Sequence, residues 1–392
     1  MDKAVPQLCD RDVCTGCGSC AQSCTHNAIE MQYNTEGYYN PVIDYEKCIG
    51  CKICEKRCPV INPIRIENVV SQAFAAWIKD DETRRKSSSG GAFSAIAIPI
   101  LKNGGVIWGT GYSDDMTPIY KCIDKTDDLD SIRGSKYVQC KIGETYKKIK
   151  EQLKEGKQVL FCGTPCHVAG LYAFLNNKLT EKLLTIDFIC HGVPSPKLFK
   201  NYINWLEDKY HDKAIDFHFR ESRFGTNYNI GTSITFMKKG KKFLYLENNS
   251  YTLGFCKDLT IHQSCDLCKF RGTKRVSDFT IGDFHGTKRE YCVTEQYKGI
   301  SCIVANSKKA TDIINTLDMQ MKQVPLERII KSNPSYTKQT NKRKVINLVA
   351  IVELPYTDIQ KQYLYPSLKD KIKTVTMVLF GGKITYIIKN IL

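Results

Sequence analysis

Eight cysteines near the N-terminus stand in two runs of identical spacing. Both runs follow the pattern Cys-x2-Cys-x2-Cys-x3-Cys, and Pro59 follows the second run. Three thiolates at two-residue intervals on a tight loop can ligate three corners of a four-iron, four-sulfur cubane. The glycines inside the runs (Gly16, Gly18 and Gly50) allow the positive φ values that such a loop needs. The spacing therefore predicts two 4Fe-4S clusters.

The fourth cysteine of each run lies past its loop and is expected to ligate the other cluster. This crossover places the first cluster on Cys14, Cys17, Cys20 and Cys58, and the second on Cys48, Cys51, Cys54 and Cys24. Zinc is the main alternative, but zinc sites favour two Cys-x2-Cys pairs. Thr25 stands where the second run has proline, so the Cys24 crossover is the less regular one. Cys9 lies outside the pattern and is expected to be structural.

More cysteines follow at the ends of predicted strands in the body of the chain. Residues 158–162 and 183–189 have the pattern of two strands around one helix, and such strands should be parallel. Ligands gather beyond the carboxyl ends of parallel strands. Cys166 and the triplet Cys190-His191-Gly192 stand at these two ends, and the helix that begins near Cys166 favours a thiolate through its dipole.

A further Cys-x2-Cys pair completes a third ligand set. We expect a third 4Fe-4S cluster on Cys166, Cys190, Cys265 and Cys268. The alternative is that these are ordinary buried cysteines of a reducing compartment. Cys162 lies on the predicted strand itself and is expected to be structural.

The elements that must position these groups alternate between strands and helices after residue 70. Strands are expected over 72–78, 105–112, 158–162 and 183–189, with helices between them, which predicts an α/β core. Residues 28–44 are expected to form a strand, a turn and a second strand, so the chain is α+β overall. We expect a dicluster ferredoxin-like domain over 1–66, an α/β domain over 67–335 and a basic tail over 336–392.

Several short segments occur in an order that resembles one known family. The segments are SSSGGAFSA, RGSKYVQ, VLFCGTPCHVAGL, IDFICHGVPSP, CDLCKFRG and RVSDFTIGDFHG, together with the N-terminal cysteine module. They resemble the family of coenzyme F(420) hydrogenase/dehydrogenase beta subunits, in its bacterial form with a fused dicluster ferredoxin domain. The resemblance covers about residues 10–335. It implies FAD beside a 4Fe-4S cluster, in a protein that passes electrons between iron–sulfur centres and a two-electron carrier such as the deazaflavin coenzyme F(420).

The same resemblance implies candidate flavin-binding residues. They are Ser88, Ser89, Gly90 and Gly91 for a diphosphate, Lys136 for a flavin phosphate or ring edge, Gly163, Thr164 and Pro165 for a wall beside the isoalloxazine, and Asp283 for hydroxyl groups. The serine–glycine segment can equally cap a helix, Lys136 can lie on the surface, and Asp283 can cap a turn. His191 is the candidate catalytic proton donor, unless it orients the neighbouring ligand or is simply a buried histidine with its hydrogen bonds satisfied.

The net charge of +16 is unevenly distributed. Residues 321–392 hold thirteen Lys and Arg against four Asp and Glu. This balance favours an anionic substrate, an acidic partner protein or peripheral contact with an anionic membrane. No nucleic-acid-binding signature accompanies it. The N-terminus has no secretory signal pattern and no apolar run is long enough to cross a bilayer, so a cytoplasmic or membrane-peripheral protein is expected.

Two functions remain open from the sequence. The first is an iron–sulfur flavoenzyme that transfers electrons to coenzyme F(420) or to a substrate of a polysaccharide pathway. The second is a non-catalytic electron-transfer protein that serves a redox partner. The sequence does not identify the substrate or the direction of electron flow.

Overall fold

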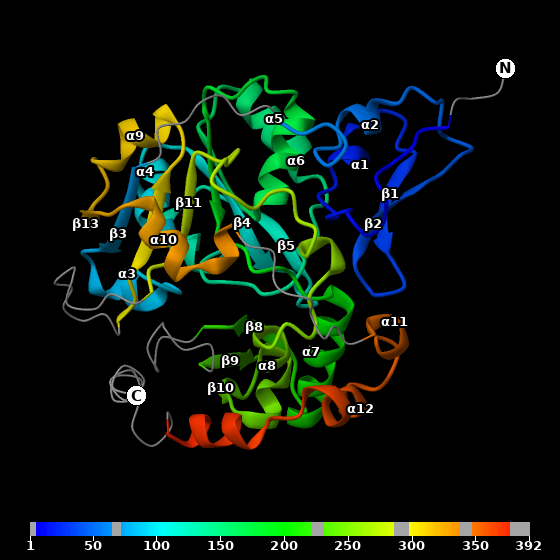
Figure 1. Cartoon of the computed structure of the whole chain (residues 1–392), viewed down its shortest axis with the longest axis vertical. Coiled ribbons are helices and arrows are strands. Elements are labelled where there is room, and N and C mark those ends of the chain that lie inside the picture. Colours follow the sequence, from blue (N-terminus) through cyan, green and yellow to red (C-terminus); the bar gives the residue numbers. More distant parts are fainter. Residues whose placement is uncertain (1–4, 65–71, 221–230, 286–297, 338–346, 377–392) are drawn as a thin grey trace.

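The computed structural model describes residues 5–64, 72–220, 231–285, 298–337 and 347–376. Three units are visible in Figure 1: an N-terminal module, a large sheet with helices on its faces, and a smaller unit of helices and strands below that sheet. Within the described residues, no helix is both long and apolar enough to cross a membrane. No disulfide joins any of the described cysteines.

The N-terminal module has two short helices and one hairpin. Strand β1 (Ile29–Tyr33) pairs antiparallel with β2 (Tyr39–Ile43), which confirms the strand–turn–strand prediction. Helices α1 (Ser19–Ser23) and α2 (Ile53–Lys56) each follow a cysteine loop. Gly16, Gly18 and Gly50 have φ values of 69°, 71° and 74°, so the cysteine loops use the left-handed conformation that glycine allows.

The large sheet has eight strands among the described residues, in the order β13-β3-β12-β11-β7-β6-β4-β5. The strands are β3 (Gln72–Ile78), β4 (Val106–Tyr112), β5 (Pro118–Ile123), β6 (Val159–Cys162), β7 (Leu183–Phe188), β11 (Phe279–Asp283), β12 (Ser301–Ala305) and β13 (Met319–Gln323). The central strands β4, β6, β7 and β11 are parallel, and the flanking strands pair antiparallel. The predicted parallel pair over 158–162 and 183–189 is therefore confirmed, as is the α/β fold.

Helices cover both faces of this sheet. The main ones are α4 (Ala92–Lys102), α5 (Thr145–Lys154), α6 (Pro165–Leu175), α9 (Lys308–Ile314) and α10 (Leu326–Ser332), with the short α3 (Asp81–Lys86) at one edge. Side chains alternate between the two faces, so that Leu160 of β6 joins the core under α4 while Phe161 joins the core under α5 and α6. Helix α6 begins at a strand end, with Thr164 as its N-cap and Pro165 in its first turn, where proline fits without losing a hydrogen bond.

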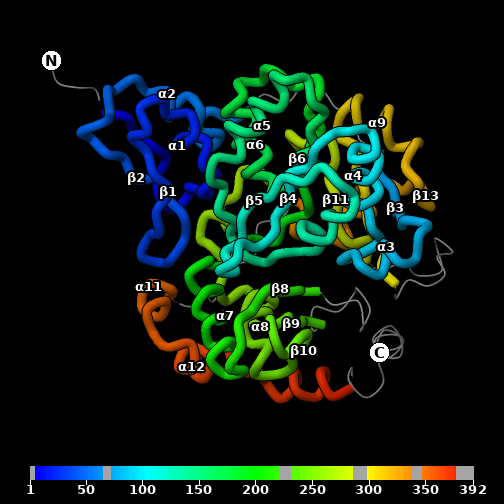
Figure 2. The backbone as a smooth tube through the Cα atoms, turned by 180° about the vertical axis from the view of Figure 1, so that it is seen from behind, coloured from blue at the N-terminus to red at the C-terminus, as the bar shows by residue number. Residues whose placement is uncertain are grey.

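The smaller unit has an aromatic core. Three antiparallel strands, β8 (Ala214–His218), β9 (Thr232–Phe236) and β10 (Gly240–Leu244), pack with α7 (Pro196–Tyr210) and α8 (Ser250–Cys256). Two helices from late in the chain, α11 (Leu348–Ile351) and α12 (Tyr356–Ile359), complete the same core, as Figure 2 shows. Tyr202, Phe217 and Tyr251 are fully buried in it.

The last described helix spans residues 368–376 and contacts the body through its polar side. Asp370 pairs with Lys257 at 2.6 Å, and Thr374 is buried. Leu368, Ile372 and Val375 are 74%, 59% and 50% exposed. The sequence places Leu368, Ile372, Val375 and Leu379 at helical spacing, and the last of these, Leu379, lies outside the described residues.

Candidate functional site

The eight N-terminal cysteines line two small cavities. Cys14, Cys17, Cys20 and Cys58, called here the first set, surround one cavity. Cys24, Cys48, Cys51 and Cys54, the second set, surround the other. This is the grouping expected from a crossover of the fourth cysteine of each run.

The loops around the first set allow no larger residue at their glycines. A Cβ at Gly16 would collide with the carbonyl oxygen of Tyr39, and a Cβ at Gly18 would collide with the side chain of Ile142. The thiol of Cys9 lines the same cavity and is hydrogen-bonded to Cys14 and Cys58. The sequence analysis expected Cys9 to be structural, because it stands five residues before Cys14 and outside the repeated spacing.

Each set brings four cysteines around one cavity, the number of ligands that a 4Fe-4S cluster needs. The thiolates of a zinc site all lie about 2.3 Å from one metal. Among the described residues, no group of three Cys, His, Asp or Glu side chains converges closely enough to hold one metal ion. A four-iron cluster takes one thiolate at each of four corners, which matches the number of cysteines in each set.

Cys166, Cys190, Cys265 and Cys268, the third set, come together at the carboxyl edge of the sheet. The charges of Cys190, Cys265 and Cys268 would all act on Cys166, which places the four sulfurs in one neighbourhood. Cys166 lies in the first turn of α6, where its sulfur is 3.1 Å from Oγ1 of Thr164. A Cβ at Gly192 would lie 3.5 Å from the Cys265 sulfur, so this glycine lets the loop after β7 approach the segment that carries Cys265 and Cys268.

Burial and the helix dipole act in opposite directions on these thiols. Burial raises the pKa of Cys166 well above its usual value, and the neighbouring Cys268 raises it further. Burial also raises the pKa of Cys190 to about 11. The thiolate expected from the helix N-terminus is therefore not favoured by the protein alone, and a bound metal would have to supply the positive charge that deprotonates the set.

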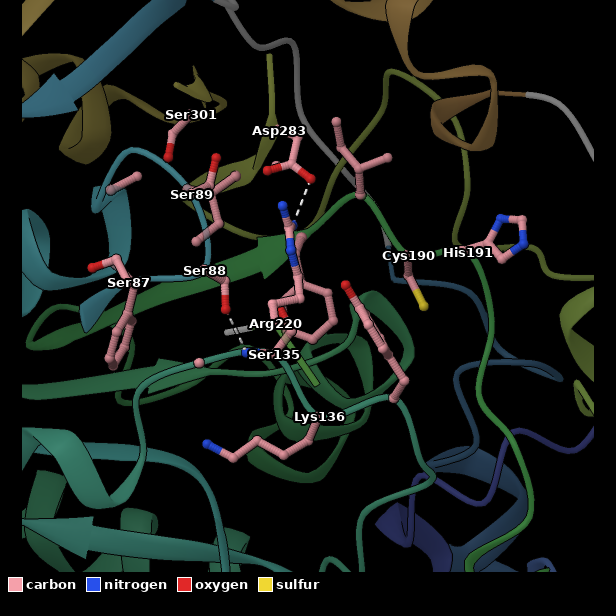
Figure 3. Close-up of a pocket in the computed structure, with 18 of the residues that line it drawn as sticks. Ser87, Ser88, Ser89, Ser135, Lys136, Cys190, His191, Arg220, Asp283 and Ser301 are labelled. Atoms are coloured by element: carbon pink, nitrogen blue, oxygen red, sulfur yellow. Dashed lines mark hydrogen bonds and ion pairs between the residues drawn. The ribbon is translucent and has the colours of Figure 1, made fainter. Parts of the chain in front are cut away.

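A cavity of about 820 Å³ lies beside the third set (Figure 3). Its walls are the ends of the parallel strands, with Cys162 at the end of β6, Cys190 just after β7, and Asp283 at the end of β11. Its volume is within the range of pockets that bind cofactors. The position matches the rule that ligands bind beyond the carboxyl ends of parallel strands.

One side of the cavity is formed by the serine segment before α4. Oγ of Ser88 accepts a hydrogen bond of 2.8 Å from the N–H of Ser135, and Oγ of Ser89 donates one of 2.9 Å to the carbonyl of Ile300. Gly91 caps the helix with a φ of 88°. These bonds fix two loops against each other and hold hydroxyl groups at the cavity wall.

An ion pair joins the two units across the cavity. Nη1 of Arg220, just after β8, lies 2.6 Å from Oδ2 of Asp283, and the two side chains are only 6% and 17% exposed. Burial opposes ionisation of Asp283, yet Arg220 and His285 hold its pKa below the usual value. Oδ1 of Asp283 is buried without a hydrogen-bond partner among the described residues, so it can accept a bond from a ligand hydroxyl.

Lys136 is held against the cavity wall by the protein itself. Its Nζ donates a 2.6 Å hydrogen bond to the carbonyl of Arg133, on the side of Ser88 and away from Cys190 in Figure 3. Burial lowers the pKa of Lys136 to about 8. A group with this pKa loses its positive charge as the pH rises past about 8, so the charge on this wall of the cavity depends on pH.

Both ring nitrogens of His191 have partners. Nδ1 lies 2.9 Å from Oγ of Ser335, and Nε2 contacts a carboxylate oxygen of Asp258. The ring lines the cavity one residue after Cys190. These two contacts fix the orientation of the imidazole at the cavity wall.

The predicted site residues fall into two groups. Eight of them line the cavity: Ser88, Ser89, Gly91, Lys136, Thr164, Cys190, His191 and Asp283. Gly90, Gly163 and Pro165 are not among its lining residues, and Cys190 is the one cysteine of the third set that is. Gly90 instead packs against the backbone of β3 and β12, and a Cβ at Gly163 would meet the hydroxyl of Tyr120 at 2.5 Å.

Sequence reasoning missed several residues that shape the cavity. Arg220 comes from the smaller unit, and Asp258 and Ser335 reach His191 from distant segments. Cys162, expected to be structural, also lines the cavity. Arg133 was visible within the RGSK segment, but no spacing in the sequence pointed to the others.

Comparison with protein families identifies three matching regions. Residues 73–147 match the N-terminal model, and residues 156–329 the C-terminal model, of the coenzyme F(420) hydrogenase/dehydrogenase beta subunits. Residues 13–62 match a 4Fe-4S dicluster domain. The chain belongs to the family of coenzyme F(420) hydrogenase/dehydrogenase beta subunits. Within this family it carries an N-terminal iron–sulfur module, as the resemblance predicted.

Individual proteins match this chain at low sequence identity or over only part of its length. One component of the F(420)H(2) dehydrogenase of Methanosarcina mazei is 23% identical over 202 residues, which are 48% of this chain and 56% of that relative, so the match spans about half of each. An uncharacterized ferredoxin of Methanocaldococcus jannaschii is 35% identical over 83 residues, 21% of this chain and 97% of the ferredoxin. A chain of the F(420)-reducing [NiFe] hydrogenase complex of Methanosarcina barkeri aligns with a TM-score of 0.44 at 14% identity, covering 69% of this family member and 91% of that chain.

Proposed function

We propose that this chain is an iron–sulfur flavoprotein that relays electrons between three 4Fe-4S clusters and FAD. The observation that carries the proposal is the position of the third set, whose Cys190 lines the 820 Å³ cavity while the set itself lies at the same sheet edge. Bound in this cavity, a flavin would exchange electrons one at a time with a cluster and two at a time with a carrier.

The residues of the cavity fit the parts of such a cofactor. Ser88 offers a hydroxyl donor and Lys136 a cation for a diphosphate. Oδ1 of Asp283 can accept a hydrogen bond from a hydroxyl group. His191, oriented by Asp258 and Ser335, can hold or deliver a proton at its Nε2 or Nδ1 beside the third set.

The first function to test is oxidoreductase activity toward a two-electron carrier of the coenzyme F(420) type. The name of the Methanosarcina mazei relative supports this carrier class. The same name, that of one part of a dehydrogenase, supports a second candidate function, in which the chain passes electrons to a partner protein that holds the substrate site. Turnover of purified chain with a deazaflavin carrier favours the first function, and turnover only after addition of a redox partner favours the second.

The cofactor content is the decisive measurement. Native mass spectrometry of the chain purified without oxygen should give the mass of three 4Fe-4S clusters and one FAD. Two clusters without flavin would refute the flavoprotein proposal and leave a ferredoxin-like module on a body of another function.

The exposed apolar side chains of the helix over 368–376 support contact with an anionic membrane surface. Leu368, Ile372 and Val375 face outward beside Lys369, Lys371 and Lys373. Sedimentation with anionic vesicles tests this part of the proposal. Deletion of residues 367–392 should abolish co-sedimentation, and unchanged binding would exclude the segment.

A further inference from the structure

The N-terminal module contacts the body through the first set. A Cβ at Gly170 would lie 3.0 Å from Cβ of Cys17 and 3.2 Å from its sulfur. Gly170 stands four residues after Cys166 on α6, which is about 6 Å along the helix axis and on the same helix face. One helix therefore connects a cysteine of the first set with a cysteine of the third set.

A second connection joins the same two sets. Lys269 follows Cys268 of the third set, and its Nζ donates a 3.3 Å hydrogen bond to the carbonyl of Val60. Val60 lies two residues after Cys58 of the first set. The charge of Lys269 acts on Cys58 of the first set, and its backbone adjoins Cys268 of the third set.

Buried hydrogen bonds hold the module in this position. Oε1 of Gln22 accepts bonds of 2.8 and 3.2 Å from the N–H groups of Tyr146 and Lys147 at the start of α5. Oε1 of Gln139 accepts a 2.7 Å bond from the N–H of Tyr39 in β2. These bonds hold the first set against the part of the body that carries the third set.

The second set lies on the outer side of the module. In Figures 1 and 2, α1 lies beside α5 and α6, whereas α2 lies farther out. Cys51 is exposed and Cys24 and Cys48 are half-buried, whereas Cys14, Cys17 and Cys58 of the first set are buried. The rate of electron transfer falls steeply with distance, so the less buried second set is the accessible end of the chain of clusters.

We propose a fixed order for the relay, which rests on the proposed function: electrons pass through the solvent-exposed second cluster, the first cluster, the third cluster and the flavin, in that order or its reverse. Lys269 is a positioning residue that raises the reduction potentials of the first and third clusters together, because a positive charge stabilises the more negative reduced state of each.

Redox titrations followed by EPR test the role of Lys269. The variant Lys269→Met should lower the midpoint potentials of the first and third clusters and leave that of the second unchanged. Lys52, next to Cys51 at the second set, supplies the matched control, and Lys52→Met should lower only the second potential. A Lys269→Met shift confined to one cluster, or none at all, would overturn the bridging role.

Spin coupling tests the order itself. In the fully reduced protein, the third-cluster signal should be broadened by its neighbour, and Cys17→Ala should remove this broadening while Cys51→Ala leaves it. The opposite pattern would refute the order. If the unmodified protein shows no third-cluster signal, the proposed function itself fails, so the two failures are distinct. Should the cysteine variants fail to fold, the Lys269→Met titration decides alone.

Discussion

The two N-terminal sets and the third set hold the same kind of ligand but are assembled differently. Each N-terminal set takes three cysteines from one loop of seven residues and one from the other run. The third set takes its cysteines from the start of α6, the loop after β7 and the segment near residue 265. The assembly of the N-terminal sets therefore depends on the backbone conformation of two short loops, whereas the assembly of the third set depends on the pairing of the sheet strands.

The largest expected effect separates these two kinds of assembly. Cys166→Ser should remove one four-iron cluster and leave the optical and EPR signals of the N-terminal pair intact, because no N-terminal ligand is changed. Iron analysis of the anaerobic protein measures the loss. Cys162→Ser, at the end of β6 but outside the third set, is the control and should keep full iron content. Full iron content in Cys166→Ser would contradict the assignment.

The next effect concerns the junction between the large sheet and the smaller unit. Asp283→Asn removes the carboxylate that pairs with the buried guanidinium of Arg220, which should reduce the free energy of unfolding by about 3–5 kcal/mol. Denaturant titration measures it. Asp81→Asn removes an exposed pair with Lys298 and should cost less than about 1 kcal/mol. Equal losses in the two variants would mean that the Arg220–Asp283 pair is screened by solvent.

A smaller effect tests how tightly the first cysteine loop of the module packs against the body. Gly18 and Gly143 have φ values of 71° and 52°, so alanine at either position should cost about 1–2 kcal/mol of left-handed strain. Only at Gly18 would the new Cβ also meet Ile142, adding about 1–3 kcal/mol. Thermal unfolding of the cluster-loaded protein compares the two variants. A larger loss in Gly143→Ala would refute the packing argument.

The smallest effect is a pH dependence with opposite signs for binding and stability. Lys136 has its pKa lowered from 10.5 to about 8 by burial. Above pH 8 its charge is lost, so affinity for an anionic flavin should fall. Between pH 8 and 10.5 the unfolded chain binds more protons than the folded chain, so the stability contributed by Lys136 should rise with pH. Flavin titration and denaturant titration at pH 7 and 9 measure the two trends, and Lys136→Met should abolish both. Parallel trends in the unmodified protein would contradict this role.

Features with short-range signals could be predicted from the sequence. The hairpin of the module follows from its alternating residues, and the parallel β6–β7 pair follows from one strand–helix–strand pattern. The strand-end rule also identified Cys166 and Cys190 as residues at one sheet edge. In each case the signal lay within about thirty residues of sequence.

Features that depend on distant packing could not be predicted. The smaller unit is completed by α11 and α12, more than 90 residues after α8 begins, and no local pattern announces that pairing. Arg220 reaches Asp283 only because this unit packs below the sheet. The raised pKa of Cys166 depends on burial, which opposes the helix dipole that the sequence suggested.

The dispersed origin of the third set has a consequence for how the protein matures. A ribosome has already delivered every N-terminal ligand once Cys58 emerges. The third set is incomplete until Cys268 has been synthesised and β6, β7 and β11 have paired. The proposed third cluster would therefore have to be delivered to a nearly folded chain, so a shortage of iron late in biosynthesis would yield molecules with a loaded module and an empty body.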